Sequence, residues 1–186
     1  MKGQEMDQGQ MRLAGWLSII NAVLTIPLAV ISFALGTRSG QESQVISVIL
    51  TVASAFLFTY IMSSLKSLLG QCYRFHETDG LITALIVLNV VLAVVSILGE
   101  IIAPLKTTIA WLLVISIVPL GVIFIVFAIK LLRLQDNLYG MLKPFSYLSI
   151  ATGVCFATIV LLPLGLLTSI VTDILLGMIF FRVAEG

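Results

Sequence analysis

The side chain best suited to chemistry is one carboxylate, Asp173, which lies in the middle of the apolar stretch 165–182. Gly165, Ser169, Asp173 and Gly177 recur every four residues, so a helix places them along one face. A membrane helix presents such a face of small and polar residues to other helices, because it permits close approach and hydrogen bonding. An ionisable group is costly in hydrocarbon, so we expect Asp173 to point inward and to have a partner.

Further polar and small residues form stripes in the other apolar stretches. Two interpretations are open: the stripes line a shared path for an ion, a proton or a small solute, or they make the contacts that hold a helical bundle together. The second interpretation is favoured, because a single acidic residue with no basic partner at the same depth is weak support for a transport path. The candidate intramembrane polar site comprises Asp173, Ser169, Asn21, Asn89, Ser96 and Glu100. The candidate helix-packing residues are Gly165, Gly177 and Gly153.

Glu100 differs from the rest of the polar set, because it lies one turn before Pro104 and therefore near the expected end of its helix. We expect it at the membrane interface, where it pairs with Lys106 or meets lipid headgroups.

Other chemistries have little support. His76, Glu77 and Asp79 crowd one connector, but His76 is the only histidine, so we expect a solvated turn and no metal site. Cys72 falls in a polar connector and Cys155 in an apolar run, so neither a disulfide nor a zinc site is expected. No hydrolase, metalloprotease or nucleotide-binding motif is present, so we predict a protein that is not an enzyme and that needs no cofactor. The net charge of +1 gives no sign of nucleic acid as a partner.

Composition predicts the fold class, an all-α polytopic integral membrane protein. Of 186 residues, 60% are hydrophobic and only 10% are charged. Several apolar runs reach the roughly 20 residues that cross a bilayer as a helix. The run that begins at Leu13 is too long for a signal peptide, so we expect it to be the first, uncleaved span. We predict one transmembrane domain over 1–186 with spans at about 13–35, 45–69, 81–103, 108–132, 145–162 and 165–183.

The number of spans depends on the region 145–183, which is far too long for one crossing of about 30 Å. Pro163 and Gly165 lie near its centre, so we predict two short spans and six in total, arranged as three consecutive hairpins. The alternative is five spans. Six spans put eight basic residues on the side of the termini, namely Lys2, Arg12, Lys66, Arg74, Lys130, Arg133, Lys143 and Arg182, against Arg38 and Lys106 on the other. This bias predicts cytoplasmic N- and C-termini in a plasma or inner membrane.

Because the connectors are short, the activity should lie in or at the membrane. We expect a scaffold, assembly factor or accessory subunit of a membrane complex, which acts through helix–helix contacts with other membrane subunits or with itself, in contact with the lipid bilayer. The alternative is a small channel or carrier for an ion or small solute, with Asp173 as its midplane group.

Overall fold

The computed structural model describes residues 8–36, 41–102, 104, 106–134, 138–158 and 160–185. These residues form α-helices, a short 3₁₀-helix and no strand, which confirms the all-helical prediction. The α-helices are α1 (Gln8–Gly36), α2 (Gln41–Cys72), α3 (Asp79–Ile101), α4 (Lys106–Leu131), α5 (Leu142–Ala157) and α6 (Leu162–Glu185), with the 3₁₀-helix η2 (Leu138–Gly140) before α5.

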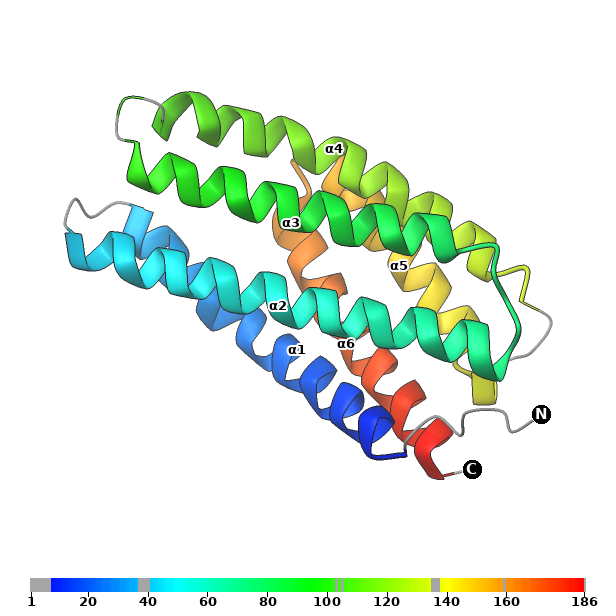
Figure 1. The fold of residues 1–186 in the computed structure, drawn as a ribbon. Coiled ribbons are helices and arrows are strands. Elements are labelled where there is room, and N and C mark those ends of the chain that lie inside the picture. The colour runs from blue at the N-terminus through cyan, green and yellow to red at the C-terminus, as the bar shows by residue number, and fades with distance from the viewer. Residues whose placement is uncertain are drawn as a thin grey trace.

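The helices form a closed ring (Figure 1). Each of them packs against its neighbours in sequence, and α6 returns to pack against α1. Across the described residues, no helix contacts one on the opposite side of the ring. In Figure 1, α1 begins and α6 ends at one end of the bundle, which we call the terminus end, while α1 and α3 finish at the other, the distal end. The space inside the ring is therefore occupied by side chains alone, and their sizes decide how full it is.

Among the described residues, five helices are long and apolar enough to cross a membrane. They are α6 and the greater part or the whole of each of α1 to α4. The remaining helix, α5, has 16 residues, or about 24 Å, which is less than the roughly 30 Å of a bilayer core. The chain thus has the helices of an integral membrane protein.

The break between α5 and α6 lies earlier in the chain than predicted. We expected Pro163 and Gly165 to separate two spans, but α5 ends at Ala157 and α6 already begins at Leu162. Proline is tolerated in the first turn of a helix, where its missing N–H has no partner to lose. Gly165 lies inside α6, where an added Cβ would approach the Phe156 ring to 2.8 Å.

Glycines set the close contacts on either side of α5 and α6. On the α1 side, a Cβ at Gly177 would lie 3.0 Å from the Gly15 carbonyl oxygen, and a Cβ at Gly15 would meet the Phe181 ring. On the α4 side, a Cβ at Gly153 would lie 2.7 Å from the Gly121 carbonyl oxygen. The backbones of α1 and α6, and of α4 and α5, can approach this closely only because no side chain intervenes.

The terminus end of the ring is tightly packed. Large aliphatic and aromatic side chains from α2 to α6 meet there and are almost completely buried, and Met11 and Ala14 of α1 join the same cluster. The most buried large members are Leu65, Leu68, Leu69, Ile82, Leu85, Phe127, Leu131, Phe145, Leu176, Ile179 and Phe180. We call this set the terminus-end core.

Candidate functional site

The site is centred on a hydrogen bond between α1 and α6. Asn21 Nδ2 donates to Asp173 Oδ2 at 2.7 Å, and both side chains are partly buried. Asp173 precedes Gly177 by one turn, and Asn21 follows Gly15 by fewer than two turns. The close approach of the two glycines therefore brings the amide and the carboxylate within hydrogen-bonding distance. Asp173 thus has the partner that a carboxylate among apolar helices requires.

Asp173 lines a cavity of about 180 Å³, which we call the inner cavity. All six α-helices contribute to its wall. Its polar side chains are Asn21, Thr25, Asn89, Thr152, Ser169, Thr172 and Asp173. Its apolar side chains are Phe58, Met62, Leu120, Phe124, Phe127, Phe145, Phe156 and Leu176. The wall thus combines a polar part with an aromatic part around one carboxylate.

A larger cavity of about 430 Å³, the outer cavity, adjoins the first one. Four residues line both: Asn21, Thr25, Phe58 and Asn89. The rest of the outer wall comes from Leu50, Thr51, Ser54, Ala55, Leu92, Ala93, Ser96 and Leu113. These residues belong to α2, α3 and α4 and lie further toward the distal end, and none comes from α5 or α6.

The two cavities and the terminus-end core make the ring asymmetric. Residues Phe127, Phe145 and Leu176 belong to both the core and the inner wall, so the core forms the floor of the inner cavity. Beyond that floor the ring is filled by buried leucine, isoleucine and phenylalanine side chains. The two adjoining cavities, whose walls carry polar side chains, thus lie between the distal half of the bundle and the terminus-end core, with Asp173 in the inner one.

The walls present acceptors more than donors. Five hydroxyl groups that line the cavities donate to a main-chain oxygen of the preceding turn of their own helix, so their lone pairs are what they offer inward. The pairs are Thr25 to Asn21 (2.8 Å), Thr51 to Ser47 (2.9 Å), Thr152 to Leu148 (2.9 Å), Ser169 to Leu166 (2.8 Å) and Thr172 to Thr168 (2.8 Å).

Asn89 lines both cavities, but its Oδ1 atom adds no acceptor to their walls. That atom is buried, has no hydrogen-bond partner among the described residues, and has almost no surface that a bound molecule could reach. The Asp173 carboxylate and the hydroxyl oxygens around it suit a cation.

Most of the predicted polar residues meet in these cavities. Asp173, Ser169, Asn21 and Asn89 line the inner cavity, and Ser96 lines the outer one. Glu100 is partly buried in the last turn of α3 and lines neither cavity. The side chain of its expected partner, Lys106, lies outside the described residues.

Sequence reasoning missed part of the wall. Thr51, Ser54 and Phe58 of α2 follow one another at three and four residues, the spacing of one helical face, so their pattern was available. The phenylalanines of the wall could not be recognised from their spacing, because phenylalanine suits a helix face that contacts lipid as well as one that lines a cavity.

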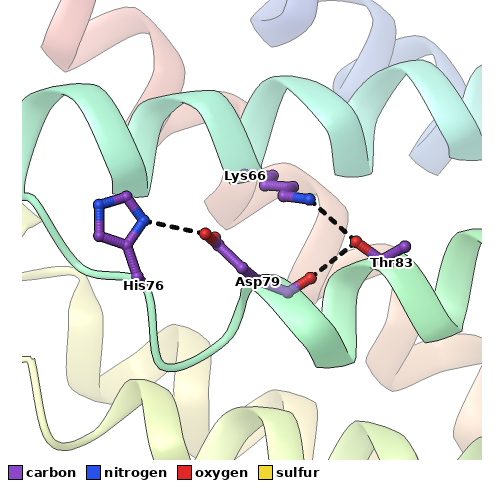
Figure 2. A network of polar contacts seen from close by, with 4 residues as sticks. All are labelled: Lys66, His76, Asp79 and Thr83. Atoms are coloured by element: carbon purple, nitrogen blue, oxygen red, sulfur yellow. Dashed lines mark hydrogen bonds and ion pairs between the residues drawn. The ribbon is translucent and has the colours of Figure 1, made fainter.

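Polar side chains in and beside the connector between α2 and α3 form a small network of contacts at the terminus end (Figure 2). His76 Nδ1 lies 2.9 Å from Asp79 Oδ2, and Lys66 Nζ donates to Thr83 Oγ1 at 2.9 Å. Thr83 Oγ1 in turn donates to the main-chain oxygen of Asp79 at 2.8 Å. In the part of the chain that the structure describes, no group of three or more histidine, cysteine or acidic side chains is placed to hold a metal ion. The contact between His76 and Asp79 stabilises the turn before α3, and the bond between Lys66 and Thr83 joins α2 to α3.

The arrangement at Asp173 can bind and hold a small polar or charged molecule within the apolar thickness of the bundle. Comparison of the chain with protein-family models, with curated proteins and with solved structures finds no match.

Proposed function

We propose that this protein is a small membrane carrier or channel that binds an ion or small solute in the inner cavity, with Asp173 as the binding group. One observation supports this most directly: all six α-helices line a cavity around a carboxylate whose one hydrogen-bond partner among the described residues is the neutral amide of Asn21. A second bond between helices joins Thr152 of α5 to Thr168 of α6. The hydroxyls of Thr25, Thr51, Ser169 and Thr172 bond within their own helices instead, so these four cavity-lining groups do not hold helices together.

We further propose six crossings, with the short helix α5 and the longer helix α6 as an antiparallel pair. The break between them, and the common end of the bundle at which α1 begins and α6 ends, support this topology. Basic residues are concentrated at the terminus end, as counted above, so the termini lie in the cytoplasm of a plasma or inner membrane. The outer cavity then faces the non-cytoplasmic side, and the terminus-end core closes the cytoplasmic side.

A second candidate function is that of an accessory subunit or scaffold. The favouring observation is that α5 ends level with Gly121, since a Cβ there would lie 2.7 Å from the Ala157 nitrogen. The 15 residues of α4 between Gly121 and Lys106, or about 22 Å, extend beyond the end of α5. Trp111 and Ile115 on this part of α4 are each 66% exposed. A helix of another subunit, or of a second copy, could pack in that place.

Transport is tested with purified protein in proteoliposomes. Solute flux should be present in the native protein and absent in Asp173→Asn, while Glu185→Gln, which changes an exposed carboxylate outside the cavities, should keep it. Monodispersity in detergent shows that each variant folds. If no flux or binding depends on Asp173, the carrier proposal is wrong.

The scaffold is tested by mild detergent extraction. A stoichiometric membrane partner that is lost with Ile115→Arg on α4 would establish it. Flux without such a partner would refute it.

A further inference from the structure

We infer that the molecule bound at Asp173 is an organic monocation, that is, a small amine or quaternary ammonium ion. The inference rests on the proposed function and adds the class of substrate to it. Three features carry it: the charge of the cavity walls, the aromatic part of the inner wall, and the volume.

The charge of the cavity walls favours a ligand that carries a single positive charge. Of all the residues that line the two cavities, only Asp173 is ionisable, and no lysine, arginine or histidine joins it. Charges inside apolar surroundings are stable only when they are paired, so one carboxylate is matched by one positive charge. A divalent ion would leave an excess charge, and an anion would be repelled.

The walls of the outer cavity, through which a molecule would reach the Asp173 carboxylate, also favour a cation. The hydroxyls of Thr25 and Thr51 in the outer wall donate hydrogen bonds to main-chain oxygens of their own helices. What they offer to a molecule in the outer cavity is therefore their oxygen lone pairs. A cation thus meets favourable dipoles before it reaches Asp173.

The aromatic part of the wall separates organic cations from alkali ions. Five phenylalanines line the inner cavity. Phe127 and Phe145 are almost completely buried in the terminus-end core, so the rings that a bound molecule can reach are Phe58 of α2, Phe124 of α4 and Phe156 of α5. Aromatic faces attract cations, and ammonium groups that carry methyl or methylene groups also gain from apolar contact with the rings. An alkali ion requires a close shell of oxygen ligands, which a wall with eight apolar side chains among fifteen does not supply on every side.

The volume sets the size of the cation. The inner cavity of about 180 Å³ is slightly larger than an engineered protein cavity of about 150 Å³ that binds benzene. It therefore has room for one nitrogen with a few carbon atoms, and the outer cavity could hold a longer substituent.

The test is equilibrium binding to the full-length protein in lipid nanodiscs. The probes are tetramethylammonium, choline, the uncharged carbon analogue of choline, sodium and potassium. We expect saturable binding of the two ammonium ions, and at least tenfold weaker binding of the uncharged analogue and of both alkali ions.

The variants separate the carboxylate from the rings. Asp173→Asn should weaken ammonium binding at least about thirtyfold, because it removes the buried opposite charge. Phe124→Leu and Phe58→Leu keep apolar volume but remove an aromatic face, and each should weaken binding about threefold to thirtyfold. The matched control is Phe56→Leu, because Phe56 is 69% exposed and lies outside both cavities. It should bind like the native protein.

Two results would overturn the inference in different ways. If sodium or potassium binds through Asp173 while the phenylalanine variants leave binding unchanged, the cavity takes inorganic ions, and only the proposed function survives. If no probe binds in a way that depends on Asp173, the inference and the carrier proposal both fail. Equal binding of choline and its uncharged analogue would also refute the monocation.

Discussion

The contact between α4 and α5 gives the sharpest test of the packing that encloses the site. Gly121→Ala adds a methyl group whose carbon would lie 2.5 Å from the Gly153 carbonyl oxygen and 2.7 Å from the Ala157 nitrogen. Both neighbours are main-chain atoms, so no side chain can rotate away. Ordinary van der Waals contact needs almost 1 Å more, and the two helices must separate by that amount.

The expected cost follows from this separation. Overpacking of a close contact typically costs 1–3 kcal/mol, while alanine gains about 1 kcal/mol over glycine in helix propensity. The Gly121 neighbours are backbone atoms of a helix with 16 residues, and α5 contacts only α4, α6 and η2 in the described residues, so little else holds it in register. We therefore expect a net destabilisation of about 0–2 kcal/mol relative to the native protein, and of about 1–3 kcal/mol relative to a glycine-to-alanine change that meets no neighbour.

Gly80→Ala is the matched control. Gly80 lies in the first turn of α3, and a Cβ there would meet no atom within 4 Å. This variant should be as stable as the native protein, or more stable by up to about 1 kcal/mol. Reversible unfolding of the purified protein in mixed detergent micelles, followed by circular dichroism, measures both. If Gly121→Ala is as stable as Gly80→Ala, then α4 and α5 do not approach as closely as described, and the enclosure of the inner cavity is wrong.

Two further predictions concern the bond to Asp173 and the topology. Asn21→Leu removes the amide that donates to Asp173 Oδ2 and should lower the free energy of unfolding by about 1–3 kcal/mol in the same assay, whereas Val23→Leu on the exposed face of α1 should not. In a chain without its native cysteines, Glu185→Cys should react with an impermeant thiol reagent only after the cells are opened, and Thr107→Cys should react in intact cells. Labelling of position 185 from outside would refute six crossings with cytoplasmic termini.

The sequence was sufficient to propose a polar candidate site around Asp173 but insufficient to show how its residues meet. Asp173 stood out because a carboxylate in an apolar stretch needs a partner, and helical spacing placed Ser169 on the same face. Asn21 belonged to the predicted set, yet nothing in the pattern paired it with Asp173 in particular. That pairing depends on α6 closing the ring against α1, which joins residues 152 positions apart. Periodicity describes one face of one helix and carries no information on which helix it meets.

The small-residue stripe of α6 shows a second limit. Such a stripe predicts a close helix contact but does not distinguish a helix of the same chain from one of another subunit. In the structure Gly177 packs on α1 and Gly165 packs on α5. The face that supported the scaffold hypothesis is therefore occupied within the chain, and a partner subunit would have to bind elsewhere, such as on the distal half of α4.

The position of the cavities follows from side-chain size along single helical faces. On α3, Ile82 and Leu85 are fully buried in the terminus-end core, while Asn89, Ala93 and Ser96 continue the same face along the cavities. The equivalent face of α2 changes at Phe58, from large leucines on the terminus side to Thr51, Ser54 and Ala55 on the distal side.

A ring with no central helix is filled only where its inward side chains are long enough to meet, because protein interiors tolerate few voids. The change from large to small residues at one level on two neighbouring helices thus specifies both the closed half and the hollow half. It also places Asp173, which projects from the far side of the ring, at the boundary between them. A carboxylate deeper in the core would have no route to water, and one further toward the distal end would not be enclosed by aromatic side chains.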